Sequence, residues 1–160
     1  MKPYIYQINK KPETKKEVGL PKIKTKKATV LTGGIDGDYN RFRENKKNGD
    51  PNMALMILSL DIINELNNEG WSVMPGDLGE NLTIDNLDYS TLKPGQKYTL
   101  GTAKIEISLI CDPCSNLKIL PYVGIGKISD FIKTLMGRRG WYARVLEPGI
   151  IAEKDHMITI

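Results

Sequence analysis

The chain has 160 residues, a net charge of +4 and 40% hydrophobic residues, enough for one domain whose core needs no disulfide or metal. Its two cysteines stand three positions apart, which excludes a disulfide framework, and its first residues lack the apolar stretch of a secretory signal. The longest apolar run, residues 53–60, is far too short for a bilayer. We therefore expect one domain over residues 1–160, in the cytoplasm and without a membrane partner.

The positive charge is concentrated at the start of the chain. Residues 1–27 hold nine lysines against two glutamates. Such a run could attract nucleic acid, but few aromatic residues are interleaved with it and no nucleic-acid-binding motif is visible. We interpret it as a solvated lysine-rich face and expect no nucleic-acid partner.

The first third of the chain predicts strands separated by loops. Residues 4–7 alternate as a strand, residues 9–21 are rich in Lys and Pro and predict an exposed loop, and residues 24–31 resume a strand. Residues 33–52 are dense in Gly, Asp and Asn and predict a long loop. Long loops in compact domains often carry function.

A long helix is predicted next. Asp50 followed by Pro51 is typical of a helix start, and Gly70 is typical of a helix end. The apolar residues between them are spread almost all round the predicted helix. We therefore expect this helix to be largely covered by a sheet, with its methionines in the core.

From Leu82 onward the pattern is mostly β. Residues 98–100 and 103–110 flank Gly101 and predict a hairpin, whose second arm alternates apolar and polar residues. A short helix is predicted from Ser129 or Asp130 to Gly137, and the last strands are predicted over residues 141–146 and 157–160. The expected fold is α+β, mostly β, resembling a β-barrel with one long and one short helix.

Cys114 is the main candidate for chemistry. It follows Pro113 at the end of a predicted β arm, where a side chain can point into a cleft. A thiolate is a nucleophile and also a soft metal ligand. Burial as a small apolar residue is the alternative. Cys111 is interpreted as a packing residue, or as a resolving thiol, and a zinc site is not expected because His156 is the only histidine.

Two further segments could bind an anion. The turn from Gly76 to Asn81 is rich in glycine, which lets backbone N–H groups approach an anion, although it could equally be a structural turn stapled by Asn81. In the loop over residues 33–52, Arg41 could grip a phosphate, and Asp38 could orient Arg41 or cap a turn. Arg138 and Arg139, which are adjacent to each other in the sequence, fall between two glycines and are expected in solvent.

Three blocks of the sequence resemble the signature of the MOSC domain, the module named after the C-terminal part of molybdenum cofactor sulfurase. PGxxGENL matches residues 75–82, PCxxL matches residues 113–117, and GxxGD followed by a basic residue matches residues 34–38 with Arg41. The blocks occur in the family order and span most of the chain. The resemblance implies a MOSC-like β-barrel. One departure is Met53, which stands where the family often has an arginine.

The resemblance also implies a chemistry. Cys114 would bind the molybdenum of the molybdenum cofactor (molybdopterin) or carry sulfur as a persulfide. Sulfur would come from a pyridoxal phosphate-dependent cysteine desulfurase acting in trans. Reduction of N-hydroxylated compounds, as in larger relatives, would need an outside electron donor. The residues implied in cofactor binding are Asp38, Arg41, Gly76, Gly79, Glu80, Asn81 and Arg144.

Two other functions stay open from the sequence. The chain could be a non-catalytic carrier that hands the cofactor from biosynthetic proteins to an acceptor protein. It could also be a thiol redox protein that uses Cys111 and Cys114 together. The redox hypothesis predicts that both cysteines matter equally, whereas the others predict that Cys114 alone matters.

Overall fold

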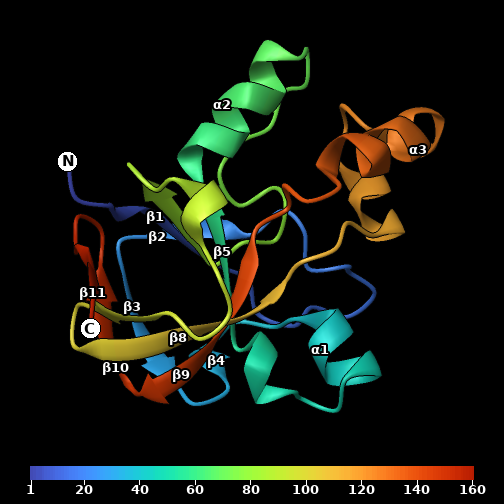
Figure 1. Ribbon diagram of the computed structural model, residues 1–160. Coiled ribbons are helices and arrows are strands. Elements are labelled where there is room, and N and C mark those ends of the chain that lie inside the picture. Colours follow the sequence, from blue (N-terminus) through green and yellow to red (C-terminus); the bar gives the residue numbers. More distant parts are fainter.

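The computed structural model describes residues 1–160 except for the side chain of Lys46, and it consists of two sheets with helices at one side (Figure 1). Eight strands form a mixed sheet in the order β11-β7-β8-β9-β5-β6-β1-β2, and three form a second sheet in the order β10-β3-β4. Of the strand pairs, β5–β6 is parallel and the others are antiparallel. The strands are β1 (Tyr4–Lys10), β2 (Ile23–Thr25), β3 (Lys27–Leu31), β4 (Gly34–Ile35), β5 (Leu55–Ser59), β6 (Leu82–Asp85), β7 (Lys97–Leu100), β8 (Ala103–Ile110), β9 (Trp141–Glu147), β10 (Gly149–Ala152) and β11 (Met157–Thr159).

The helical segments are short. The α-helices are α1 (Arg41–Lys46), α2 (Leu60–Asn68) and α3 (Gly124–Leu135), and the 3₁₀ turns are η1 (Pro51–Met53), η2 (Tyr89–Thr91) and η3 (Ser115–Ile119). In Figure 1, α2 and α3 stand above the sheets, while α1 lies below α3 on the same side of the molecule. Among the helices described, none has the length and apolar character needed to cross a membrane.

The eight-stranded sheet curls strongly but does not close. Ile5 of β1 bonds the turn before β11, through its N–H to the Asp155 carbonyl and through its carbonyl to the Lys154 N–H, both at 2.9 Å. The edge strands β2 and β11 stand at the two ends of the strand order, and no described residues pair them. The predicted α+β, mostly β fold is confirmed, and the word barrel fits it only loosely.

The prediction of one long helix from Asp50 to Gly70 is wrong. Asp50 does cap Pro51–Met53, but this is a single 3₁₀ turn, and the chain then runs as strand β5 before α2 begins. All five residues of β5 are buried, since it lies between β6 and β9 with side chains packed on both faces. A strand buried on both faces is apolar at nearly every position, and over a short run this pattern cannot be told from a buried helix.

Other boundaries also differ from the predictions. The predicted loop over residues 33–52 contains β4 and α1, and the predicted strand over residues 24–31 is divided into β2 and β3. The predicted short helix begins earlier, at Gly124, which makes α3 the longest helix of the three. The hairpin β7–β8 and strands β1, β9 and β11 confirm the predictions.

Strand β5 connects three apolar clusters. Leu55 and Ile57 belong to the cluster enclosed by the sheets, and Leu58 belongs to the cluster beneath α2 and α3. Met56 packs with Met53, Cys111 and Tyr142 in a third, smaller cluster. These clusters hold β5 and its neighbours rigidly, and the third of them lies against a cavity.

Candidate functional site

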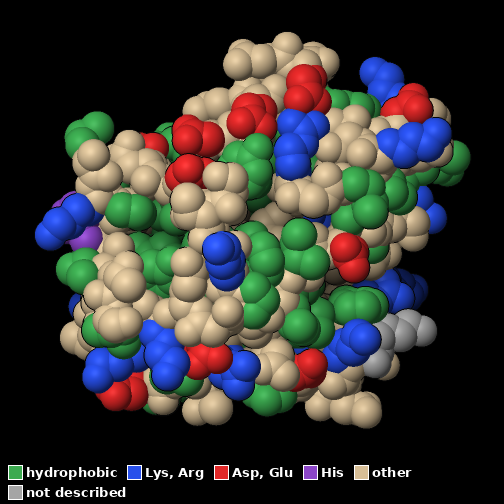
Figure 2. Space-filling view, in the orientation of Figure 1, with side chains coloured by type: hydrophobic (Ala, Val, Ile, Leu, Met, Phe, Trp, Pro, Cys, Tyr) green, Lys and Arg blue, Asp and Glu red, His purple; other side chains and the backbone are tan. Residues whose placement is uncertain are grey.

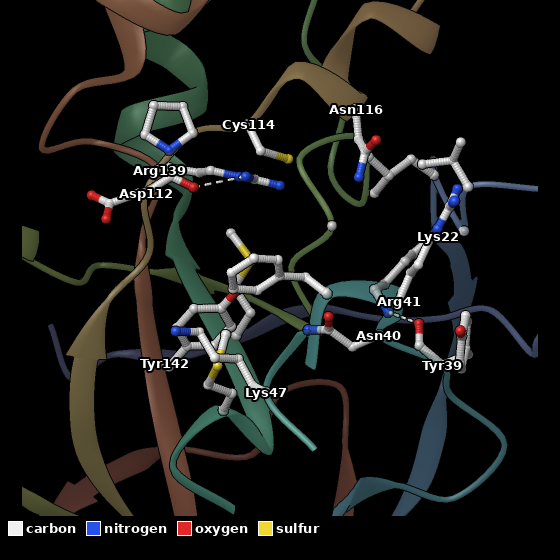
Figure 3. Close-up of a pocket in the computed structure, with 18 of the residues that line it drawn as sticks. Lys22, Tyr39, Asn40, Arg41, Lys47, Asp112, Cys114, Asn116, Arg139 and Tyr142 are labelled. Atoms are coloured by element: carbon white, nitrogen blue, oxygen red, sulfur yellow. Dashed lines mark hydrogen bonds between the residues drawn. The ribbon is translucent and has the colours of Figure 1, made fainter. Parts of the chain in front are cut away.

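A cavity of about 520 Å³ lies on the side of the molecule that carries α1 and η3 (Figure 3). Its walls come from the loop before β2, the start of α1, the end of β8, the segment 112–116 and the start of β9. These segments are far apart in sequence. The volume lies within the range of roughly 300–1,000 Å³ that small-molecule sites occupy.

The Cys114 thiol faces this cavity. Cys114 is half-buried, lies directly before η3, and makes no hydrogen bond that caps the turn. In Figure 3 its sulfur points toward the cavity, with Arg139 below it and Asn116 to one side. The predicted position of a thiol at the edge of a cleft therefore matches the geometry, and the thiol is free.

Basic side chains dominate the charged lining. Lys22, Arg41, Lys47 and Arg139 line the cavity together with one acidic side chain, Asp112. Arg41 and Lys47 are exposed, whereas Lys22 and Arg139 are buried. An excess of fixed positive charge in a concave, partly apolar site favours an anionic ligand.

Arg139 is buried, which contradicts the expectation that it lies in solvent. It is 7% exposed, and its Nη1 donates to the Asp112 carbonyl at 2.8 Å while its Nη2 donates to the Leu78 carbonyl at 3.1 Å. Burial opposes the charged form, but the nearby Cys111 and Cys114 sulfurs favour it, and the pKa of Arg139 is raised overall. The guanidinium therefore stays cationic next to the Cys114 thiol.

Lys22 and Asp38 form a buried ion pair at another wall. The Lys22 Nζ lies 2.6 Å from Asp38 Oδ1, and the two side chains are 3% and 2% exposed. Burial lowers the pKa of Lys22 even though Asp38 opposes this shift. Asp38 also accepts hydrogen bonds from the Lys11 N–H and from Asn81 Nδ2, both at 2.9 Å. Asp38 thus positions Lys22 and does not itself line the cavity.

The turn from Gly76 to Asn81 is mostly behind the cavity wall. Of its residues only Leu78, through its carbonyl to Arg139, and Gly79, which lines the wall, face the site. Asn81 is 3% exposed and uses its amide internally, because Oδ1 accepts from the Met56 N–H at 3.0 Å and Nδ2 donates to Asp38. These contacts describe Asn81 as a residue that supports the structure. Its hydrogen-bond partners, however, are distant in sequence and do not belong to its own turn.

Glu80 is completely buried beside this turn. Its Oε1 accepts hydrogen bonds from the Gly76 N–H at 2.7 Å and from Thr83 Oγ1 at 2.9 Å. Among the described residues, nothing bonds its Oε2. Burial raises the pKa of Glu80 to about 7, against the opposing effect of these hydrogen bonds. The side chain holds the glycine turn in place and does not line the cavity.

Arg144 lies away from the other candidates. It projects from β9 with its side chain 45% exposed, and its guanidinium lies 3.2 Å from the Glu106 carboxylate on the neighbouring strand β8. It is not among the residues that line the cavity. The structure thus brings together Cys114, Arg41 and Gly79 at the cavity, with Asp38 and Asn81 behind them, and leaves Arg144 outside.

Cys111 is a packing residue in this structure. It is 1% exposed, and its sulfur lies 3.8 Å from the Met56 sulfur. Burial raises the pKa of the Cys111 thiol, which makes it a weak nucleophile. Its environment therefore differs from that of Cys114, which is three residues away.

A break in the alternation of β8 forms part of the apolar wall. The predicted inward-facing residues are buried as far as Ile107, after which Ser108 is buried while Leu109 and Ile110 are exposed. The pairing of β8 with β9 shifts register over the same residues, as at a β-bulge. Leu109 and Ile110 consequently line the cavity, and apolar side chains are visible on the surface between α3 and α1 (Figure 2).

Sequence reasoning missed Lys22, Arg139, Asn116 and Tyr142, all of which line the cavity. Lys22 is one of many lysines in its segment, and Arg139 has no local feature that separates it from Arg138. Asn116 lies inside the PCxxL block, so its position next to Cys114 was the one available signal. Tyr142 is buried beside the equally buried Ala143 in β9, so no alternation marked it in the sequence.

Comparisons with known proteins agree with this architecture. YiiM from Geobacillus stearothermophilus aligns over 99% of this chain and 75% of its own, with a TM-score of 0.75 and 23% sequence identity. The YUAD protein from Bacillus subtilis aligns over 98% of this chain and 94% of its own, with a TM-score of 0.76 and 19% identity. At such identities the likeness shows a shared fold. No curated protein sequence matches the chain significantly.

The model of one protein family covers most of the chain. The MOSC domain model matches residues 44–158, which include the PGxxGENL and PCxxL blocks. The resemblance inferred from the sequence is thereby confirmed. The chain belongs to the MOSC domain family, a family related to the molybdenum cofactor.

Proposed function

We propose that the cavity binds the molybdenum cofactor and that Cys114 is its ligand to molybdenum or a carrier of sulfur as a persulfide. The observation that carries this proposal is a free, half-buried thiol facing a cavity of about 520 Å³ whose charged lining is mainly basic. A soft sulfur donor beside cationic groups suits a ligand that is both thiophilic and anionic.

The residues present fit such a ligand. Cys114 would supply the sulfur donor, and the excess of basic side chains in the lining would attract anionic groups. The missing Cβ of Gly79 leaves room at the wall for Leu20, whose Cδ2 would stand 3.0 Å from it. Within the described side chains no three His, Cys, Asp or Glu groups gather to hold a metal ion. The protein would therefore contribute few metal ligands, and the bound cofactor would supply the redox chemistry.

In this proposal the other candidate residues act indirectly. Asp38 fixes the Lys22 ammonium, and Asn81 fixes Asp38. Gly76 and Glu80 hold the turn that presents Gly79. Arg144 has no part in the proposed site, because it pairs with Glu106 outside the cavity.

Sulfur transfer would use the Cys114 thiol alone. Its thiolate would attack the terminal sulfur of a cysteine desulfurase persulfide, forming an S–S bond at Cys114 while the desulfurase thiolate leaves. We propose that residues 1–160 act as one domain in the cytoplasm, where thiols stay reduced. An electron donor protein would be needed if the bound cofactor reduces a substrate.

The test is the molybdenum and pterin content of protein purified without oxygen, for wild type, Cys114→Ala and Cys111→Ala. We expect both to co-purify with wild type and with Cys111→Ala, and molybdenum to be lost from Cys114→Ala. Equal loss in both variants would favour a thiol pair instead. Wild type without molybdenum or pterin would contradict cofactor binding, and sulfane sulfur on Cys114 would then decide whether it carries persulfide.

A further inference from the structure

We propose that Arg139 is the anion-binding residue of the cavity and that it holds an anionic oxygen or sulfur group of the ligand beside the Cys114 thiol. This inference deepens the proposed function and rests on it in assuming that one ligand meets both residues. It assigns a binding role to a side chain that sequence reasoning placed in solvent.

A comparison of Arg139 with the adjacent Arg138 shows that Arg139 lacks an anionic partner. The Arg138 guanidinium bonds both carboxylate oxygens of Glu69, at 2.6 and 2.9 Å, and approaches Glu65 at 3.5 Å. Figure 2 shows acidic and basic side chains side by side near α2. The described part of the chain supplies no carboxylate to Arg139, although Arg139 is the more deeply buried of the two.

The hydrogen bonds of Arg139 do not neutralise its charge. Its two Nη atoms donate to neutral carbonyl oxygens of Asp112 and Leu78, and its Nε has no partner among the described residues. A guanidinium does not lose its proton in a protein, and a buried charge without a counter-charge is costly. The cavity that Arg139 lines is the place from which a counter-anion can come.

The backbone keeps Arg139 in this position. Gly140 has a φ of +109°, and a Cβ there would clash with the Ile57 carbonyl oxygen of β5. The chain therefore lies directly against the central strand at this point. Figure 3 shows the Arg139 side chain extending from there into the cavity below the Cys114 sulfur, with its bond to Asp112. A guanidinium held by two fixed carbonyls loses little entropy when it binds an anion.

The other basic side chains are less suited to this role. Lys22 already has a carboxylate partner in Asp38. Arg41 and Lys47 are exposed, so water and salt screen their charges. Arg139 is thus the one described cavity residue that combines burial, a full charge and the lack of a carboxylate partner.

The test compares two reagents that alkylate the same thiol. Iodoacetate is anionic and iodoacetamide is neutral. In each case the Cys114 sulfur forms a bond to the CH₂ carbon and iodide leaves. The thiolate fraction affects both rates equally, so their ratio, relative to the ratio for free glutathione, reports the electrostatic field at Cys114. Mass spectrometry of peptides assigns the alkylation to Cys114.

We expect the ratio of the alkylation rate with iodoacetate to that with iodoacetamide to be about tenfold higher for wild type than for glutathione. This is the size of the effect of one charge-assisted hydrogen bond. Inorganic phosphate should slow alkylation of wild type. Arg139→Gln removes the charge but keeps an amide that can donate to the carbonyls, and it should lose both effects. Arg138→Gln is the matched control and should keep them. Arg139→Lys, which retains the charge, should keep part of the preference.

A wild-type ratio equal to that of glutathione would overturn the proposal, and this result needs no variant to fold. A raised ratio that persists in Arg139→Gln would also overturn it, because the field would then come from other residues. If Arg139→Gln does not fold, Arg139→Met is the second neutral variant and the same ratios decide. Purified protein without molybdenum or pterin would contradict the proposed function but leave the alkylation result intact.

Discussion

The Gly76–Asn81 turn and the Cys111–Asn116 segment both border the cavity, but they contribute to it in different ways. The turn keeps its carboxylate and amide groups inside the protein, where Glu80 bonds Gly76 and Asn81 bonds Asp38 and Met56. The second segment gives the cavity side chains, among them Cys114 and Asn116. A motif that marks the family can therefore support the site from behind or supply side chains that face the ligand. Only the contacts in the structure distinguish these two roles.

The largest loss of stability that tests this difference is expected at Gly76. It has a φ of +94°, and a Cβ would stand 2.6 Å from the Lys22 carbonyl oxygen, so Gly76→Ala should lower the free energy of unfolding by more than about 3 kcal/mol. Gly95 has a φ of +92° with nothing within 4 Å, and Gly95→Ala should cost only about 1 kcal/mol. Urea unfolding measures both. Equal losses would show that the turn is not tightly packed.

A pH series on Glu80 tests its burial. Because its pKa is about 7 in the folded protein and near 4.5 when unfolded, the folded state holds the extra proton between these values. Its contribution to stability is therefore fully present below pH 4.5 and is lost as the pH rises through about 7. Relative to wild type, Glu80→Gln should gain up to about 3 kcal/mol between pH 4.5 and pH 8. A constant difference across this range in urea unfolding would argue against a buried, protonated Glu80.

Asn81 distinguishes support from ligand binding. Asn81→Ala leaves the Met56 N–H without its acceptor and removes a donor to Asp38, which should cost about 2–3 kcal/mol of stability. Asn116→Ala, at the cavity wall, should cost less than about 0.5 kcal/mol. Thermal unfolding measures the two. A stable Asn81→Ala protein that had lost only cofactor would reverse the roles we assign to the two segments.

Substitution of the two cysteines should produce a smaller difference in stability than the substitutions above. Cys111→Ser places a hydroxyl in the cluster around Met56 and should lower stability by about 1–2 kcal/mol. Cys114→Ser faces the cavity and should change stability by less than about 0.5 kcal/mol. Chemical unfolding under reducing conditions is the measurement. Similar losses for both would mean that Cys114 also packs in the core.

Arg144 should show the smallest effect. Its ion pair with Glu106 is at the surface, so Arg144→Ala should change stability by less than about 0.5 kcal/mol. We also expect its molybdenum content to equal that of wild type, whereas Arg139→Gln should contain less. A strong loss of cofactor from Arg144→Ala would contradict the boundary that we draw around the site.

Local signals predicted the fold where one face of an element is exposed. The β7–β8 hairpin was predicted from its alternation and the turn at Gly101, and both arms are present. The same reasoning failed at residues 55–59, because both faces of β5 are buried and the alternation disappears. It failed again at Ser108, where a shift in pairing with β9 reverses the facing of the last residues of β8.

The candidate site was predictable in its thiol but not in its charges. Cys114 stands in a recognisable block, and its exposure to the cavity agrees with that prediction. Arg139 was expected in solvent but is buried, and Arg144, expected in cofactor binding, pairs with Glu106 outside the cavity. Each is an arginine near a strand, and only the position of that strand in the sheet determines what its guanidinium can reach.

The sequence by itself determined the family, the mostly β character and the cysteine on which the proposed chemistry depends, because these follow from short blocks and local periodicity. The tertiary structure alone decided which charges meet that cysteine. Arg139 comes from a segment distant in sequence from those of Lys22 and Arg41, and all three surround one cavity because β5 and its apolar clusters hold those segments together. Burial then distinguishes Arg139, which lacks a carboxylate, from Arg138, which has two.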